Sequence, residues 1–209
     1  MQVIKFISLH HYGGTVTNLY QSSQKMTLEQ LNEYHQSRWP DFPSTIKMPD
    51  GNLCFIGYNI CILPNGTWFQ SRIIGEEGAH TKGHNLTTIG IVLAGNFLVD
   101  KPTLEQMTTL KTLLLAFIYN NSNYYQYLGI KIKDGTIIDI SASRIWPHRY
   151  FSSTSCNCLP DSWGRDLLNE HFKLNAFQKL YTTLTQLLLS LTRVRKFGYA
   201  NTECGAEKD

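Results

Sequence analysis

Apolar segments of strand length alternate along the chain with amphipathic segments of helix length, and this alternation limits the possible folds most strongly. Several of the apolar runs are nearly continuous, which is typical of strands buried on both faces of a sheet. We predict strands at residues 3–9, 53–63, 68–74 and 88–96, a strand pair at 129–140, and helices at 27–38, 103–117 and 166–196. The alternation predicts an α/β fold with a central mixed β-sheet and helices packed on it.

Local signals place the ends of two helices and one turn. Thr27 is followed by Gln30, and Thr103 by Gln106, which is the spacing of a capping box. Residues 64–67 (PNGT) contain an Asn-Gly pair that tolerates a positive φ. We therefore expect helices to begin after the two threonines and a hairpin to turn at Asn65-Gly66.

Composition excludes several classes of protein. Hydrophobic residues make up 42% of the 209 residues and charged residues 17%, which argues against disorder. No stretch approaches the roughly 20 apolar residues of a membrane span, so we expect no stable membrane insertion. The formal charge of +3 is mild and is compatible with an anionic polymer as partner. We expect no nucleic-acid partner.

The first residues do not resemble a secretion signal. Residues 1–9 hold one Lys and a short apolar run, and the pair His10-His11 follows at once. A signal peptide needs a longer apolar region and a cleavage site of small residues. The expectation is a protein that stays in the cytoplasm until it is released.

The five cysteines are odd in number and unevenly spaced, which argues against a disulfide scaffold. Cys54 and Cys61 lie in an apolar run and are expected to be core residues.

Three other residues form a candidate metal site. His11 ends a predicted strand, and His148 and Cys156 lie eight residues apart in a predicted loop. Two imidazoles and one thiolate suit Zn²⁺, and three protein ligands leave a fourth position for water, as in catalytic zinc sites. On its own, a His in the place of His11 more often serves packing, whereas a loop that holds both a His and a Cys has little use in packing.

The chain resembles the type 2 N-acetylmuramoyl-L-alanine amidases, a family that includes short phage endolysins and peptidoglycan recognition proteins. The resemblance is carried, in chain order, by residues 7–14 (ISLHHYGG), 56–59 (IGYN), 64–67 (PNGT), 70–72 (QSR), 78–80 (GAH) with Asn85, 89–91 (IGI), 94–97 (AGNF), 148–149 (HR) and 154–156 (TSC). It implies an amidase domain over residues 1–168 and a helical C-terminal extension over residues 169–209.

The resemblance implies a zinc ion held at the sheet edge by His11, His148 and Cys156. His11 is preferred to His10 because the family's first ligand directly precedes the small turn residues. Tyr58 and Thr154 are expected to be catalytic, as hydrogen-bond donors to the attacking water or the oxyanion.

Two positions depart from the family pattern. The family continues Cys-Pro-Gly after the ligand, whereas this chain has Cys156-Asn157-Cys158, so Cys158 is an alternative ligand. Tyr150 stands where the family has an Asp, so a carboxylate near the metal is missing.

Three further residues are assigned to substrate binding: His80, Asn85 and Arg149. His80 either contacts the substrate or lies next to a metal ligand and supports it. Arg149, with Arg144 and Trp146, lines either a groove for sugars and peptide carboxylates or a solvated basic surface.

The implied function is zinc-dependent cleavage of the amide between N-acetylmuramic acid and L-alanine in bacterial peptidoglycan, by a phage or prophage endolysin released at lysis. One alternative is a recognition module that binds peptidoglycan without cutting it, although Cys156 argues against it. The other is a cytoplasmic amidase that recycles muropeptides. For the C-terminal extension, packing on the domain or a second subunit, contact with a wall or membrane, and a small binding module stay open, as does the oligomeric state.

Overall fold

The structure is a computed structural model that describes residues 1–13, 18, 20–151 and 160–173. Thr154, Cys156, Cys158 and most of the expected C-terminal extension lie outside the described residues. The elements are β1 (Gln2–Ile4), β2 (Phe6–His11), α1 (Leu28–Arg38), β3 (Ile60–Ile62), β4 (Trp68–Gln70), β5 (Thr88–Leu93), α2 (Leu104–Tyr119), α3 (Ser122–Leu128), β6 (Thr136–Ile138), η1 (Ala142–Arg144), β7 (Ile145–Pro147), η2 (His148–Tyr150) and α4 (Trp163–Lys173).

A five-stranded sheet with the order β4-β3-β5-β2-β7 forms the centre of the described chain. The strands β3, β5, β2 and β7 are parallel, and β4 joins β3 as an antiparallel hairpin partner. A second, two-stranded sheet pairs β1 with β6 in parallel. This architecture confirms the predicted α/β class with a mixed central sheet.

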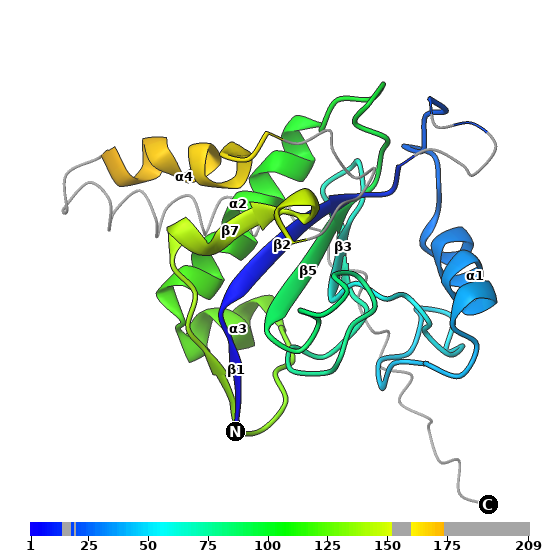
Figure 1. Cartoon of the computed structure of the whole chain (residues 1–209), viewed down its shortest axis with the longest axis horizontal. Helices are drawn as coiled ribbons and strands as arrows, with labels where there is room; N and C mark the ends of the chain where they lie inside the picture. The colour runs from blue at the N-terminus through cyan, green and yellow to red at the C-terminus, as the bar shows by residue number, and fades with distance from the viewer. Residues whose placement is uncertain (14–17, 19, 152–159, 174–209) are drawn as a thin grey trace, which may run out of the picture.

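Helices cover both faces of the sheet. In Figure 1, α2, α3 and α4 lie on one side and α1 lies on the other. Alternate residues of each strand serve the two sides, because successive side chains of a strand point to opposite faces. The α2 side buries Ile60, Ile62, Ile91 and Leu93 with the leucines of α2, and the α1 side buries Cys61, Val92 and Phe69 with Leu28 and Leu31.

The predicted helix starts and the turn are confirmed. Thr27 and Thr103 are the N-caps of α1 and α2, and both capping boxes are complete. Gly66 adopts a φ of +79° in the turn between β3 and β4. Leu104, the first residue of α2, is 78% exposed, whereas Leu110, Leu113 and Leu114 of the same helix are buried.

The strand predicted at 53–63 is wrong over its first half, since only Ile60–Ile62 is a strand. The backbone N–H groups of residues 55–57 are bonded by side chains instead of a neighbouring strand. Phe55 N donates to Asn32 Oδ1, and Gly57 N donates to His35 Nδ1 at 2.8 Å. The first half of the apolar run is therefore buried under α1 without being a strand. Its apolar composition reflects this burial, and composition alone does not distinguish it from a buried strand.

Other elements also differ from the sequence prediction. The hairpin predicted at 129–140 is absent from the described residues: Ile132 bridges to Ile74, while β6 pairs with β1. The predicted loop at 145–157 begins with β7, the edge strand beside β2. Helix α3 was not predicted. Because these segments are only three to seven residues long, they leave no periodicity to detect.

None of the described helices is long and apolar enough to cross a membrane. The predicted division between residues 168 and 169 falls inside α4 and stays a prediction, since residues 174–209 are not described.

His35 makes stability dependent on pH. Burial, with the nearby charges of Arg72 and Arg38, lowers the pKa of His35 to about 4. Its neutral Nδ1 accepts the hydrogen bond from Gly57 N, and protonation removes that acceptor. The unfolded chain takes up the proton near pH 6.5 and the folded chain only near pH 4. The His35 contribution to stability is therefore full above pH 6.5 and falls as the pH is lowered to 4.

We expect His35→Gln to flatten the pH dependence of unfolding between pH 7 and 4 relative to the parent. The group contributes up to about 3 kcal/mol of this loss, from the size of the pKa difference. Denaturant unfolding at both pH values measures it. Since other buried histidines titrate in both proteins, only the difference between the curves counts. Parallel curves would show that His35 is not the titrating group.

Candidate metal centre

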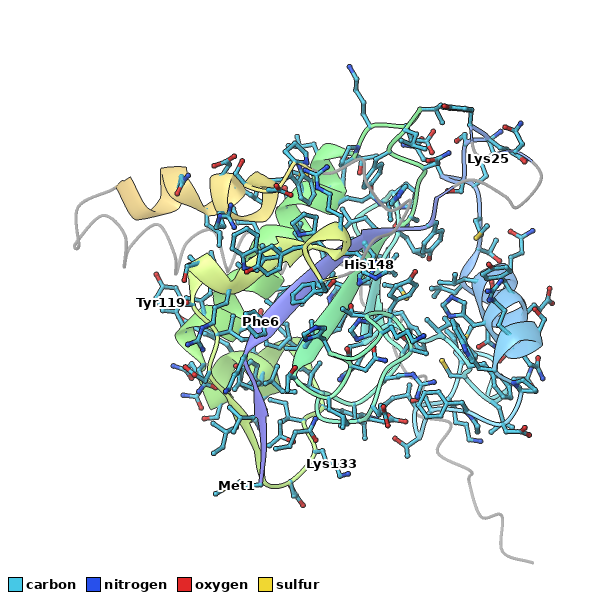
Figure 2. All side chains as sticks on the ribbon, in the orientation of Figure 1. Met1, Phe6, Lys25, Tyr119, Lys133 and His148 are labelled. Carbon is cyan, nitrogen blue, oxygen red and sulfur yellow. The ribbon has the colours of Figure 1, made fainter. Side chains whose placement is uncertain are left out.

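The pairing of β2 with β7 brings two histidines side by side. Leu9 is in register with Pro147, so the next residues along the two parallel strands are His10 and His148. Their ring centroids are 4.5 Å apart. Figure 2 labels His148, which lies beside β2 where the chain leaves β7. The two imidazoles come from segments far apart in sequence and meet at the carboxyl ends of neighbouring strands.

His10 and His11 face opposite sides of the sheet. His10 is in register with Val92 and His11 with Leu93. Val92 belongs to the core on the α1 side, and Leu93 to the core on the α2 side. Side chains that are opposite each other on paired strands share a face. His10 therefore lies on the α1 side of the sheet, and His11 on the α2 side.

The imidazole of His11 already has protein partners. Its Nδ1 accepts a hydrogen bond from Phe97 N at 3.1 Å, and its ring stacks on the Phe97 ring with centroids 5.8 Å apart. Burial lowers the pKa of His11 to about 4, against a backbone hydrogen bond at Gly95 and the charge of Asp100, which raise it. The geometry favours His10 over His11 as the partner of His148, contrary to the sequence-based choice of His11 as ligand.

The His10–His148 pair has the chemistry of a metal-ligand set. Burial is the largest cause that lowers the pKa of His10, followed by repulsion from His148, His80 and His11. Burial also lowers the pKa of His148. Both imidazoles are therefore neutral near pH 7, which is the form that binds metals. In the described part of the chain, no three His, Cys, Asp or Glu side chains group as metal ligands, and the expected third ligand, Cys156, lies outside it.

Tyr58 lies beside this pair on the α1 side, as its assignment to the site requires. Its half-buried ring has its centroid 5.0 Å from that of His10 and 5.4 Å from that of His35. The Tyr58 carbonyl accepts a hydrogen bond from Ser71 Oγ at 2.7 Å. The next residue, Asn59, receives the Gly90 N–H at its side-chain oxygen, which ties this segment to β5.

His80 is buried behind His10, with ring centroids 5.5 Å apart and 7% of the residue exposed. Two glycines make room for its ring: a Cβ on Gly78 would lie 2.5 Å from His80 Cδ2, and one on Gly90 would lie 2.5 Å from His80 Cγ. Burial lowers the pKa of His80 to about 3, with smaller contributions from His148 and Arg72. This position favours a role for His80 in supporting the metal ligand His10 over a direct contact with substrate.

The other residues assigned to substrate binding are engaged with the protein. Asn85 Oδ1 accepts hydrogen bonds from the backbone N–H groups of His80 and Thr81, at 3.1 Å and 2.7 Å. Arg149 Nε donates to Asp161 Oδ1 at 2.8 Å in an ion pair on the surface. Their roles toward substrate stay predictions.

The two residues expected beside Arg149, Arg144 and Trp146, also contact other side chains of the protein. Arg144 pairs with Asp139 at 2.8 Å. The Trp146 ring stacks on Tyr150 with centroids 4.0 Å apart, and the Arg165 guanidinium lies 3.9 Å from its centroid.

Sequence reasoning missed His10, His35 and Thr81. The signal for His10 was available in the strand 3–9, because Ile7 and Leu9 share a face with His11 and leave His10 on the other. The partners that surround His10 on that face depend on loop contacts that no local pattern shows.

Comparison with known proteins identifies the family of the chain. The family model described as N-acetylmuramoyl-L-alanine amidase matches residues 1–159. Peptidoglycan-recognition protein 2 of Holotrichia diomphalia is 29% identical over 112 residues, which are 53% of this chain and 52% of that protein. The peptidoglycan recognition protein of Trichoplusia ni is 37% identical over 67 residues, 32% of this chain and 37% of that protein. The matches thus span about half or less of these relatives.

Among solved structures, the Ph2119 endolysin from a bacteriophage of Thermus scotoductus superposes with a TM-score of 0.51 at 14% identity, covering 81% of this chain and 86% of that one. This likeness supports the fold alone. The family model covers most of the chain, including His10 and His148, and the chain belongs to the N-acetylmuramoyl-L-alanine amidase family that this model describes.

Proposed function

We propose that this protein is a zinc-dependent hydrolase of bacterial peptidoglycan that cleaves the amide between N-acetylmuramic acid and L-alanine. The observation that carries the proposal is the pair of neutral imidazoles of His10, which is buried, and His148, which is half-buried, at the carboxyl ends of parallel strands. Amidase family membership supplies the reaction class. A pair of uncharged imidazoles so close together suits a divalent cation better than a structural role in an apolar core.

We assign the metal to His10, His148 and Cys156, with Cys158 as the alternative thiolate. This set replaces His11 by His10 and keeps the expected two nitrogens and one sulfur. Bound zinc would lower the pKa of a water molecule and polarise the scissile carbonyl. Three protein ligands would leave the fourth coordination position of the zinc for water or substrate.

In this proposal Tyr58 stabilises the transition state. Its ring stands next to His10, and its hydroxyl donates a hydrogen bond to the carbonyl oxygen as negative charge develops there. Thr154, two residues before Cys156, would supply a second donor. Peptidoglycan is the proposed partner, and a phage or prophage endolysin is the proposed type of enzyme. A recognition protein without catalysis does not need the thiolate that Cys156 provides.

The assignment of His10 is tested by a matched pair of variants in the full chain. His10→Asn is expected to lose zinc and activity together. His11→Asn should keep zinc, because the amide oxygen can still accept the Phe97 N–H. Elemental analysis after gel filtration and turbidity assays measure both properties. Zinc loss in His11→Asn with retention in His10→Asn would restore the sequence-based assignment.

The function itself is tested on purified bacterial cell walls. We expect the turbidity of a wall suspension to fall with the protein, to stop falling after chelation, and to resume with added zinc. New N-terminal alanine should appear in step with clearing, since the cut amide joins muramic acid to L-alanine. Cys156→Ser should abolish both signals and Cys158→Ser should preserve them, and the reverse would exchange the two cysteines. Binding to walls without release of alanine would instead support a recognition module.

Tyr58→Phe separates catalysis from packing at that position. The ring keeps its contacts, but one hydrogen-bond donor is lost. Loss of a single donor to an oxyanion typically raises the barrier by about 2.7–4 kcal/mol, or about 100- to 1000-fold in kcat. Zinc content and melting temperature should be unchanged. A decrease in kcat of less than about threefold would remove Tyr58 from the catalytic set.

A further inference from the structure

The hydroxyl of Thr81 lies between two imidazoles in the interior. Its Oγ1 is 2.8 Å from His80 Nδ1 and 3.4 Å from His10 Nε2. Thr81 itself is fully buried. Nothing in the proposed function so far uses this hydroxyl, although it is in contact with one of the two histidines that define the site.

We propose that Thr81 is a positioning residue that fixes which ring nitrogen of His10 carries the proton, and thereby leaves Nδ1 of His10 unprotonated and able to bind a metal. The inference rests on the proposed function, because it assumes that His10 is a zinc ligand. It goes beyond that function by assigning a role to a chain of three side chains: His10, Thr81 and His80.

The chain of contacts permits only two arrangements of protons. The hydroxyl has one proton, so it donates to one imidazole and accepts from the other. If it donates to His80 Nδ1, then His10 donates from Nε2 and keeps a bare Nδ1. If it donates to His10 Nε2, then Nδ1 of His10 carries the proton and cannot bind a metal. Metal binding therefore selects the first arrangement, in which His80 is protonated at Nε2.

The surrounding structure holds the hydroxyl in place. Asn85 Oδ1 accepts the Thr81 backbone N–H at 2.7 Å. The ring of His80 is confined between the backbones of Gly78 and Gly90, where a Cβ at either position would come within 2.5 Å of it. These contacts hold the Thr81 backbone and the His80 ring on either side of the hydroxyl. Among the described residues, His80 Nε2 is buried without a hydrogen-bond partner, so the contact of Nδ1 with Thr81 is the hydrogen bond that holds this ring.

A hydrogen bond behind a metal-bound histidine commonly determines metal affinity, and its removal weakens binding about 10- to 100-fold. We expect Thr81→Val, which has the same shape without the hydroxyl, to lower the zinc affinity by this factor, as measured by competition with a chelator. Thr81→Ser should restore affinity to within about threefold of the parent, because the hydroxyl returns. The full chain is used throughout, with zinc alone as the probe.

Thr109→Val is the matched control. Thr109 is also buried, and its hydroxyl donates a hydrogen bond to Gly66 O at 2.7 Å, but it lies on α2, away from His10 and His80. The melting temperature of Thr109→Val should fall as that of Thr81→Val does, but its zinc affinity should equal that of the parent. Equal affinities in Thr81→Val and Thr109→Val would overturn the inference, as would failure of Thr81→Ser to rescue.

Nitrogen NMR of labelled histidine in the zinc-loaded parent provides a test that needs no variant, should Thr81→Val fail to fold. We expect His80 to be protonated at Nε2 and bare at Nδ1. Protonation at Nδ1 of His80 in the loaded protein would disprove the proton arrangement. A protein that binds no zinc at all would refute the proposed function instead, so the two failures are distinguishable.

Discussion

The parallel pairing of β2 with both of its neighbours is the constraint on which the candidate site depends. The register with β7 sets Leu9 against Pro147 and therefore His10 beside His148, while the register with β5 sets His10 against Val92. A shift of β2 by one residue against both neighbours would turn His10 to the α2 side and replace it with His11. The site is thus specified by strand register before any loop contributes to it.

The loops that complete the α1 side are held by buried polar groups rather than by strand ladders. Arg72 donates to the carbonyls of Ile56, Glu77 and Phe42 and lies 4.4 Å above the Phe42 ring. These bonds join the segment before Tyr58 to the segment before His80. Because Ile56 and Arg72 are both deeply buried, losing the Arg72 donor would leave the Ile56 carbonyl unsatisfied in the interior. The position of Tyr58 relative to His10 follows from this network.

Sequence reasoning reached the fold class, both capping boxes, the hairpin at Asn65-Gly66 and the core role of Cys61, because each has a local signature. The short strands β6 and β7 could not be reached, since three residues carry no period and their pairing partners are remote. The site was predicted in part: His148 and Tyr58 came from the resemblance and lie where the site needs them. His10 was passed over because the motif was aligned on the small turn residues instead of on the alternation of the strand.

His10 and His11 show how a sheet gives two identical neighbours different chemistry. On the α2 side, Nδ1 of His11 accepts a hydrogen bond from Phe97 N, and the imidazole stacks on the Phe97 ring. On the α1 side, His10 meets only rings and one hydroxyl among the described residues, with Thr81 at Nε2. The face that a strand residue occupies therefore decides whether its nitrogen is already bonded by the protein or is left to a ligand.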